Sequence, residues 1–482
     1  MKASLGIDLG TSGVKAVVAD ERLRPLAEAE RHYPVSSPQP GWAESDPLVW
    51  LSAAQEAASE ALDGAGQVEI AGVGIDGQLH GGLLLDARGL PIRPAILWPD
   101  TRAEAVLAPW RELPEEDLAK LANPITPGML GPICAWVRQH EPQAFAKVAQ
   151  VASAKDWLRA QLLGQADQVT DPTDASATLL WDVHADGWHS AALELAGLRP
   201  DQLGALASPG SVAGHTGRAA GAFGLPDGIP VATGCGDVAA AAYGMGLSAG
   251  QRMVSLGTGH QVVATAEHLS SAWPPAFHAY RGVDPFGLHM AAPLNGGYAL
   301  NLARGELGAT WEELYAAADY VPGPTTPIFM PYYAPERFGP GVSKSKGWHA
   351  AKQVGGWDPA LSDSPPDRPL AELLYAVLEG VCCNLAMAAR DLPGPAPEVL
   401  YAVGGGAREA GYRQLLADAF GAAIQTAPAV SWSALGAARL GFAAAGLAAT
   451  AELSGGQTTA PGENAGLQER FAAFRQLAGR RP

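Results

Sequence analysis

A turn rich in glycine and hydroxyl side chains lies near the N-terminus, between two apolar runs. Residues 6–18 read Gly-Ile-Asp-Leu-Gly-Thr-Ser-Gly-Val-Lys-Ala-Val-Val, a pattern that predicts two strands joined by a tight turn. Glycine in such a turn lets a ligand approach the backbone, and successive N–H groups form an anion-binding nest. We therefore predict that Gly10, Thr11 and Ser12 bind a phosphate group.

A carboxylate closes the first of these runs. Asp8 stands at the mouth of the turn, where it could hold a magnesium ion, through water, against the bound phosphate. An ordinary hairpin is the alternative, and the turn alone favours it. The pattern recurs in residues 253–264, where Gly257 and Thr258 again follow an apolar run. Two related turns predict two similar domains that bind one nucleotide from opposite sides. Neither is a Walker loop, because no Gly-Lys-Ser/Thr follows four spacer residues.

The composition is that of a large globular protein. Its 482 residues, 48% hydrophobic and 17% charged, suffice for two or three domains with sizeable cores. The net charge of −17 argues against nucleic acid or an anionic membrane as the main partner. It does not exclude ATP, because a local nest and Mg²⁺ outweigh distant, screened charge.

Two further features indicate a cytoplasmic protein. The four cysteines have no zinc or disulfide spacing, so we expect buried thiols in a reducing compartment. The first residues lead straight into a strand, so we expect no signal peptide. The apolar stretch 437–449 contains Arg439 and glycines, which favours a core helix over a membrane span.

Strands and helices alternate along the chain, which predicts the α/β class. Asp46-Pro47 predicts the start of a helix that continues to about Leu62,. The apolar run 68–76 predicts a buried strand. A strand over 229–233 leads through Gly-Cys-Gly to Asp237 and an alanine-rich helix.

The division into domains follows from a turn. Pro226-Asp227-Gly228 favours a hinge,, so we predict domains over residues 1–228 and 229–482. The region 322–369 is rich in Pro, Gly, Ser and Lys, and we expect a long, partly mobile segment there.

Short motifs follow one another over most of the chain. After residues 6–18 come Gly-Ile-Asp-Gly-Gln-Leu-His-Gly at 74–81, Arg-Pro-Ala-Ile-Leu-Trp-Pro-Asp-Thr-Arg at 93–102, Lys-Asp-Trp-Leu at 155–158, Gly-Cys-Gly-Asp at 234–237, Ser-Leu-Gly-Thr at 255–258, Ala-Val-Leu-Glu-Gly at 376–380, Gly-Gly-Gly-Ala-Arg at 404–408 and Ala-Leu-Gly-Ala-Ala-Arg at 434–439. Each motif alone is weak evidence. The ordered set resembles the FGGY carbohydrate kinases, and most closely the bacterial xylulokinase branch of that family.

The resemblance implies two actin-like (ribonuclease H-like) ATPase domains with a deep cleft between them. The sugar would lie on the first domain and ATP mainly on the second. The reaction implied is transfer of the ATP γ-phosphoryl group to a sugar hydroxyl, with Mg²⁺ and with closure of the cleft to exclude water. Family habit also favours a homodimer.

Asp237 is the candidate general base. Phosphoryl transfer needs a carboxylate within hydrogen-bond reach of the attacking hydroxyl, and Asp237 follows a predicted strand, at whose end α/β sites cluster. On sequence alone an N-cap for the following helix is the stronger interpretation; the family resemblance reverses that order. Asp237 is also a second candidate magnesium contact beside Asp8.

The resemblance assigns the remaining site residues by motif. Gln78, Leu79 and His80 match the segment that binds the sugar, and Trp98 and Asp100 would be the next contacts. An amide, an imidazole and a carboxylate suit a polyhydroxylated ligand, since they form hydrogen bonds with hydroxyls. A core position for Trp98 and a structural contact for His80 are the alternatives. On the nucleotide side, Asp8, Gly257 and Thr258 would lie at the phosphates, and Gly404, Gly405 and Gly406 at the adenosine.

Several positions depart from the family pattern. Val238 replaces the usual Asn or Gln after the candidate base, and loss of that polar contact changes discrimination between sugars. Ile133 stands where Lys is usual, and His260 where a small residue is common. Residues 332–357 lack the usual Gly-Glu-Arg-Thr-Pro run.

Three functions remain open at this point. The first is an ATP-dependent kinase of a ketopentose that converts D-xylulose to D-xylulose 5-phosphate. The second keeps the chemistry but uses another ketose, polyol or sugar acid. The third is a regulator that binds sugar or nucleotide without catalysis, which retention of the candidate base disfavours.

Overall fold

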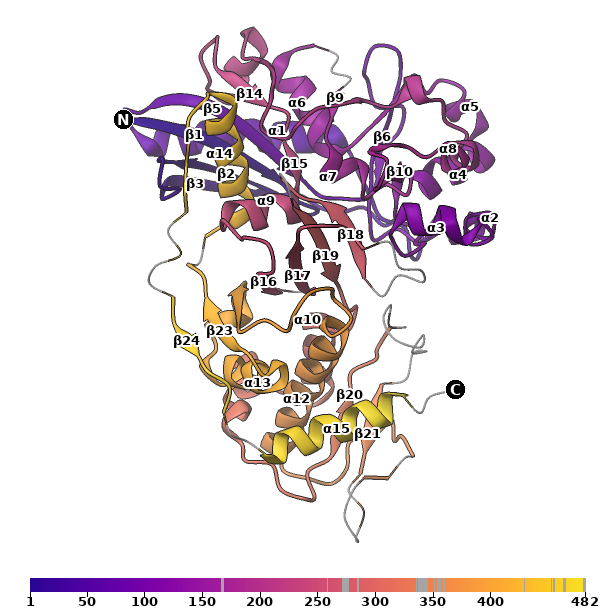
Figure 1. Cartoon of the computed structure of the whole chain (residues 1–482), viewed down its shortest axis with the longest axis vertical. Helices are drawn as coiled ribbons and strands as arrows, with labels where there is room; N and C mark the ends of the chain where they lie inside the picture. The colour runs from indigo at the N-terminus through magenta and orange to yellow at the C-terminus, as the bar shows by residue number, and fades with distance from the viewer. Residues whose placement is uncertain are drawn as a thin grey trace.

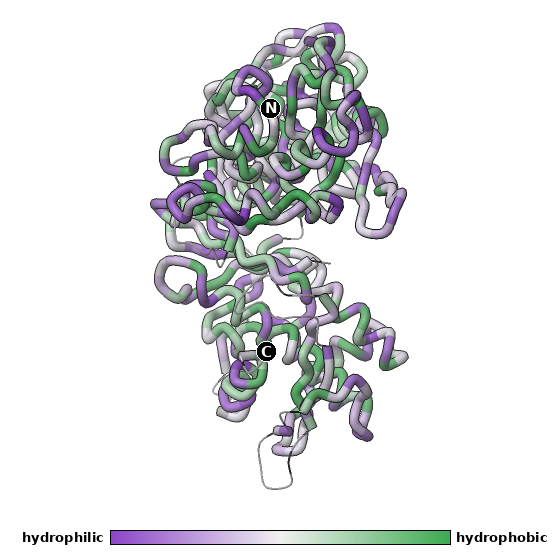
Figure 2. Tube along the Cα trace, turned by 90° about the vertical axis from the view of Figure 1, so that its right-hand side faces the viewer, coloured by the Kyte–Doolittle hydropathy of each residue, from purple (hydrophilic) through white to green (hydrophobic). Residues whose placement is uncertain are grey.

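A computed structural model gives the fold as two lobes stacked along the long axis of the molecule (Figure 1). The structure describes all residues except 166–168, 258, 271–276, 284–285, 335, 337–345, 351, 353–356, 359, 429, 452, 454–455, 463–464 and 480–482. Hydrophobic segments run through both lobes, and a thin waist lies between them (Figure 2). The predicted α/β class is correct.

The first lobe is built on a sheet in the order β13-β14-β5-β1-β2-β3, with β15 also paired to β5. Strands β1, β2 and β3 are antiparallel, and β5 lies parallel to β1. The predicted hairpin is therefore present at its centre. The strands of this first sheet are β1 (Lys2–Leu9), β2 (Gly13–Ala19), β3 (Pro25–His32), β5 (Glu69–Gly77), β13 (Val212–His215), β14 (Pro230–Ala232) and β15 (Cys235–Gly236).

The second lobe repeats this plan in the order β18-β19-β17-β16-β22-β23-β24. Strands β16 and β17 form the second predicted hairpin, β19 extends it in antiparallel fashion, and β22 lies parallel to β16. Two similar domains are therefore present, as the repeated turn predicts. The strands are β16 (Arg252–Leu256), β17 (His260–Ala266), β18 (His278–Arg281), β19 (Gly287–Ala291), β22 (Val399–Val403), β23 (Ala423–Thr426) and β24 (Thr458–Thr459).

Helices cover both sheets. The Asp46 carboxylate accepts a hydrogen bond from the Leu48 N–H and begins α1, which the proline at position 47 also favours,. The longer helices are α1 (Pro47–Ala65), α4 (Leu130–His140), α6 (Ala154–Leu163), α9 (Asp237–Gly244), α10 (Gly297–Glu306), α12 (Leu370–Ala389), α13 (Ala410–Phe420), α14 (Trp432–Ala444) and α15 (Ala465–Gly479). Shorter ones include α7 (Pro172–Ala175) and α11 (Trp311–Ala316).

The predicted boundary at residue 228 falls between two strands of one sheet. β14 and β15 follow that position and complete the first sheet, and α9 continues from them. Helix α14 also returns from the C-terminal part of the chain to pack on β1 and β5 (Figure 1). Within the segment 322–369, the structure contains the short antiparallel pair β20 (Ile328–Met330) and β21 (Gly347–His349); residues 335, 337–345, 351, 353–356 and 359 lie outside the described residues.

Contact between α14 and the first sheet is backbone to backbone. A Cβ atom added at Gly6, Gly72 or Gly74 would lie 1.8–1.9 Å from a carbonyl oxygen of α14, and one added at Gly436 would lie 1.9 Å from the Ala240 oxygen of α9. Only glycine leaves room for these approaches. The Ala- and Gly-rich sequence of α14 is therefore a packing requirement.

Gly74→Ala is expected to lower the free energy of unfolding by at least the ~1–3 kcal/mol typical of overpacking. The new Cβ would meet the Ala437 oxygen at 1.8 Å, and backbone atoms cannot rotate away as a side chain can. Urea denaturation measures the change. Gly217→Ala is the control, because nothing lies within 4 Å of a Cβ there; equal stability of the two variants would contradict the packing account.

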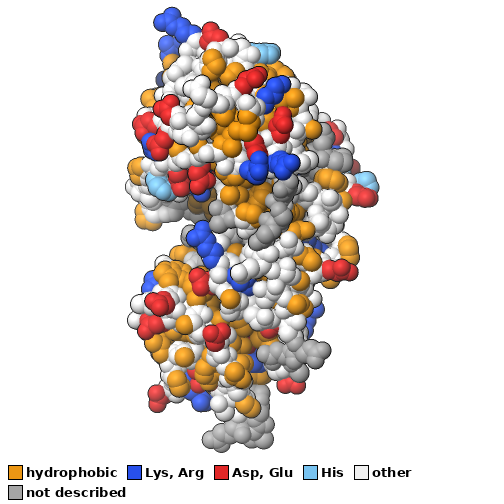
Figure 3. Space-filling model, turned by 90° about the vertical axis from the view of Figure 1, so that its left-hand side faces the viewer, with side chains coloured by type: hydrophobic (Ala, Val, Ile, Leu, Met, Phe, Trp, Pro, Cys, Tyr) orange, Lys and Arg blue, Asp and Glu red, His pale blue; other side chains and the backbone are white. Residues whose placement is uncertain are grey.

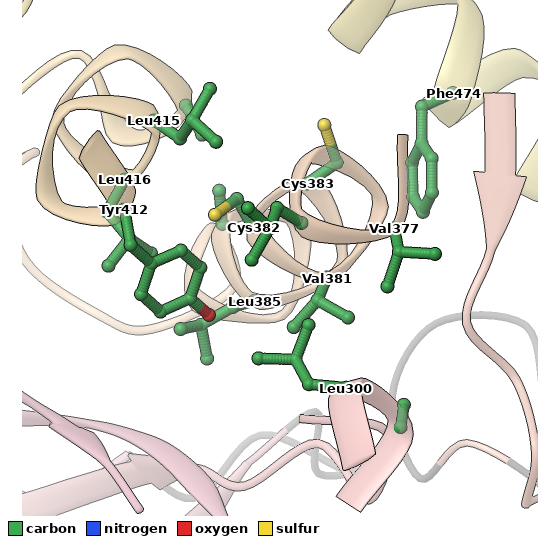
Figure 4. Close-up of a cluster of buried hydrophobic side chains, with 14 of the residues drawn as sticks. Leu300, Val377, Val381, Cys382, Cys383, Leu385, Tyr412, Leu415, Leu416 and Phe474 are labelled. Carbon is green, nitrogen blue, oxygen red and sulfur yellow. The ribbon is translucent and has the colours of Figure 1, made fainter. Parts of the chain in front are cut away.

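The cysteines lie in the cores, as predicted. Cys134, Cys235, Cys382 and Cys383 are buried and free, and the last two sit on α12 among apolar side chains of the second lobe (Figure 4). Helix α12 is long and apolar enough to cross a membrane by composition. It is mostly buried within the lobe, which is the ordinary position of a core helix.

Candidate active site

A cavity of about 340 Å³ opens between the two lobes, beside the ends of β1, β5 and β15. Both lobes contribute to its wall, so its shape depends on how they meet. The residues that line it are Thr11, Leu79, His80, Trp98, Asp237, Val238, Gly259, His260, Gln261, His278, Met290, Ala292, Pro293, Leu294 and Tyr298.

Asp237 begins α9 at the edge of this cavity. The preceding residues pair with β5, and a Cβ added at Gly236 would meet Leu79 Cδ2 at 2.1 Å, so a larger residue there would displace the Leu79 side chain. The Asp237 carboxylate accepts a hydrogen bond of 2.8 Å from the Val238 N–H. Burial, together with the negative charge of Asp8, raises the pKa of Asp237 to about 7,. A carboxylate with this pKa can take up a proton near neutral pH.

Asp8 lies on β1, directly beside Asp76 on β5. Its Oδ2 accepts hydrogen bonds from Ser433 (2.5 Å) and Ser431 (3.3 Å) at the start of α14, while burial raises its pKa. Both oxygens of Asp76 are buried, and burial together with the negative charges of Asp8 and Asp237 raises the pKa of Asp76 well above the usual range. Ionisation of Asp76 is therefore disfavoured beside Asp8,.

Asp76, Ser431 and Ser433 are not among the site residues predicted from the sequence. The tripeptide Gly-Ile-Asp occurs at residues 6–8 and again at 74–76, which could have pointed to Asp76. Nothing in the sequence pairs the two serines with Asp8, because they lie more than 400 positions away.

The turn at residues 10–13 is closed by a hydrogen bond from the Gly10 N–H to the Gly13 oxygen (3.0 Å). The Tyr33 hydroxyl donates to the Gly10 oxygen (2.6 Å). Thr11 Oγ1 accepts a hydrogen bond from Trp98 Nε1 (2.9 Å), and both side chains line the cavity. The structure thus brings the first predicted phosphate turn and one predicted sugar contact together.

Two of the three residues of the motif at 78–80 line the cavity. Leu79 and His80 line the cavity, whereas the Gln78 amide faces the Gly10 oxygen at 3.4 Å and is absent from the lining. His80 adopts a φ of 75°, a conformation that a non-glycine residue keeps only where its surroundings enforce it. Its Nδ1 lies 2.9 Å from the Ala177 oxygen and its Nε2 lies 3.2 Å from the Tyr280 hydroxyl of the second lobe.

Asp100 lies outside the cavity lining. Its side chain is almost fully buried, accepts hydrogen bonds from the Arg102 guanidinium at 2.7–3.0 Å and accepts another from the Ala43 N–H at 2.7 Å. These contacts support a structural role, in which Asp100 holds the loop that carries Trp98.

The glycines predicted for the nucleotide meet near the end of β16. Gly257 follows that strand, and Gly404 has a φ of 92°, with Leu256 backbone atoms 2.9 Å from where its Cβ would be. Gly404 and Gly405 line a larger cavity of about 650 Å³ between the lobes, together with Lys15 and Ser431. Gly406 is buried behind them. Thr258 lies outside the described residues. Figure 3 shows the surface notched between the lobes, with acidic side chains above and basic ones below.

A buried ion cluster supports the segment that carries Asp237. Lys155 Nζ lies 2.5, 2.8 and 3.0 Å from carboxylate oxygens of Asp156, Asp171 and Asp174. Burial alone would lower the pKa of Lys155, but these carboxylates outweigh it and raise that pKa. The Thr173 hydroxyl donates to Asp171 (2.5 Å) and accepts from the Gly236 N–H (2.7 Å). The motif Lys-Asp-Trp-Leu at residues 155–158, among the buried residues of α6, is the sequence feature that could have indicated this cluster.

The donor set is compatible with magnesium. Asp8 and Asp237 are close enough for the charge of Asp8 to raise the pKa of Asp237. A cation bound between them would offset this repulsion and lower that pKa. Among the described residues no group of three or more His, Cys, Asp or Glu side chains could hold a metal ion. Magnesium commonly keeps several waters and binds through one or two carboxylates plus substrate phosphates, so two aspartates fit it.

Comparison with known proteins agrees with this arrangement. Residues 3–244 match the N-terminal domain of the FGGY family of carbohydrate kinases, and residues 253–445 match its C-terminal domain. The chain belongs to the FGGY family of carbohydrate kinases. This FGGY kinase is therefore an enzyme that transfers a phosphoryl group to an alcohol group of a sugar, and it has the two-domain actin-like fold. Kinases of this family use ATP.

Xylulose kinases of several bacteria are similar to this chain over most of their length. The chain is 34% identical to the xylulose kinase of Escherichia coli K12 over 452 residues, which are 92% of this chain and 90% of that protein. It is 31% identical to the xylulose kinase of Streptomyces coelicolor, over 90% of this chain and 86% of that protein. A crystal structure named as a xyloylose kinase, from Brucella ovis, has a TM-score of 0.86 at 30% identity and covers 99% of this chain and 97% of its own.

Two positions that depart from the family pattern line the cavity, and one does not. Val238 and His260 both contribute to the cavity wall, whereas Ile133 lies on α4 and is fully buried in the hydrophobic core. Within residues 332–357, the described Glu336 carboxylate accepts hydrogen bonds from the Leu294 N–H and from Asn295 and Asn384.

Proposed function

We propose that this FGGY kinase phosphorylates D-xylulose to D-xylulose 5-phosphate, with ATP as donor, Mg²⁺ as cofactor and Asp237 as the general base. The observation that carries the proposal is the position of Asp237, a carboxylate with a pKa of about 7 at the edge of a cavity that both lobes line. The names of the relatives support the choice of sugar.

In the proposed reaction Asp237 accepts the proton of the attacking hydroxyl as its oxygen bonds to the γ-phosphorus and the bond to the β-phosphate oxygen breaks. Leu79, His80 and Trp98 orient the sugar beside it. N–H groups of the turns at residues 10–12 and 257–258 hold the phosphates. When bound at Asp8 and Asp237, magnesium supplies charge that offsets the phosphates. The two lobes exclude water, which limits ATP hydrolysis.

An ADP-release assay over a panel of ketoses, polyols and sugar acids, with and without Mg²⁺, tests the proposal. D-xylulose should give the highest kcat/KM, and removal of Mg²⁺ should abolish turnover. A higher kcat/KM for another sugar would replace the substrate and keep the chemistry. ADP release with no sugar at all would contradict the proposal.

The pH dependence provides a separate prediction. Because the base must be ionised, kcat/KM for the sugar should fall as the pH decreases through the pKa of Asp237, approaching tenfold per pH unit. That pKa is about 7 without the cation, and bound Mg²⁺ should lower it. Measurements from pH 5 to 9 at saturating ATP test this. The residual activity of Asp237→Asn should lack the acidic limb, which separates titration of Asp237 from titration of ATP. An acidic limb that persists unchanged in Asp237→Asn would exclude Asp237 as the base.

A further inference from the structure

His260 is an unpartnered polar side chain in the wall of the cavity that holds Asp237. It begins β17, three residues after Gly257, and is only 2% exposed. Its Nδ1 is buried with no hydrogen-bond partner among the described residues. A buried ring nitrogen without a partner costs free energy. A molecule bound in the cavity that His260 lines could supply such a partner.

The fold makes room for this ring. A Cβ added at Gly296 would lie 2.6 Å from both Cβ and Cγ of His260, so the glycine before α10 admits the imidazole. Burial lowers the pKa of His260 to about 4. At neutral pH the ring is uncharged, with one N–H donor and one acceptor nitrogen, which suits a hydroxyl group better than a charged ligand.

Some polar groups of the cavity already have protein partners, whereas Gln261 and Tyr298 also line it. Both ring nitrogens of His80 lie within hydrogen-bond distance of oxygens of Ala177 and Tyr280, and Trp98 Nε1 donates to Thr11. Much of the remaining wall is apolar, namely Leu79, Val238, Met290, Ala292, Pro293 and Leu294. A sugar held against this wall would leave hydroxyls unsatisfied unless another side chain bound them.

We propose that His260 binds a hydroxyl group of the sugar acceptor and supplies the polar contact that Val238 lacks. His260 is then a specificity-determining residue for a polyhydroxylated acceptor. This inference rests on the proposed function, since it assigns the cavity to the sugar. With Val238 and His260 in its wall, the pocket presents its polar group at a different place from a pocket that has an amide at 238 and a small residue at 260.

The experiment compares His260→Leu with His260→Gln in the full-length enzyme. Leu fills similar space without a hydrogen bond, so kcat/KM for D-xylulose should fall about 10- to 100-fold, while KM for ATP should change less than twofold. Gln retains a donor and an acceptor and should recover most of the loss. Thermal unfolding of both variants checks that they are folded.

Deoxy analogues of D-xylulose identify the contact. Wild type should discriminate strongly against one analogue, and His260→Leu should lose that discrimination, as a double-mutant cycle between enzyme and substrate requires. Val238→Asn added to His260→Leu should restore part of the lost kcat/KM.

Two outcomes would overturn the inference. If His260→Leu raises KM for ATP and leaves the sugar unaffected, the ring serves the nucleotide. If a folded Leu variant matches wild type for every sugar and analogue, the ring binds no acceptor. Failure of the proposed function is distinguishable, because wild type itself would then phosphorylate no sugar of the panel.

Discussion

Asp237→Asn is expected to lower kcat about 10²–10⁴-fold while the dissociation constant of D-xylulose changes only a few-fold. The amide has nearly the same shape and its oxygen can still accept the Val238 N–H hydrogen bond, but it cannot take up the proton of the sugar hydroxyl. Steady-state kinetics and calorimetric titration of the sugar measure the two quantities. Asp227→Asn, the same change in an exposed turn, should leave both unaltered.

The same substitution should stabilise the fold at alkaline pH. Folding raises the pKa of Asp237 from 3.8 to about 7, so the native state binds the extra proton between these values and wild-type stability falls as pH rises through them. Asparagine removes this loss. The variant should therefore gain at most about 4 kcal/mol at pH 8 and nothing at pH 3.5. A loss of stability at pH 8, together with weak sugar binding, would indicate a structural role for Asp237.

Lys155→Met is expected to lower the free energy of unfolding by about 3–5 kcal/mol at pH 8, because removal of one partner leaves buried charges uncompensated. The Lys155 side chain is 1% exposed, and the three carboxylates that contact it are 0–5% exposed. At pH 5.5 the loss should be smaller, since the carboxyl groups can then bind protons. Denaturation in urea at both pH values measures the difference.

Lys15→Met is the matched control for this change. Lys15 lies 3.7 Å from Glu30, and both side chains are 44% exposed, so the pair should contribute no more than about 0.5 kcal/mol. If the two variants had equal stability, the ion cluster would not support the first lobe. Because Lys155 and its partners lie beneath the segment of Asp237, loss of activity in Lys155→Met at temperatures where it remains folded would show that the cluster also positions the base.

The departures from the family pattern acquire a physical meaning in the structure. Ile133, on α4, is buried in the hydrophobic core. Val238 on α9 and His260 on β17 lie 22 positions apart in the sequence and both line one cavity wall. We expect acceptor specificity to depend on this pair more than on either residue.

The local sequence alone determined the two glycine-rich hairpins, the α/β class and the strands that end beside Asp237. Alternation of apolar residues and the steric freedom of glycine act over a few residues, so these features could be read without a fold. Family motifs then indicated which side chains to examine. Leu79, His80, Trp98, Thr11 and Asp237 do line one cavity.

Only the tertiary structure decided which polar groups find partners. Asp100 was predicted to bind sugar but is held by Arg102, Asp8 is bonded by two serines from the other end of the chain, and β14 and β15 extend the first sheet beyond residue 228. Hydrogen bonds and burial depend on residues that come together through folding, and no local pattern records those partners. The charge state of Asp237 and the unpartnered ring of His260 therefore became visible only in three dimensions.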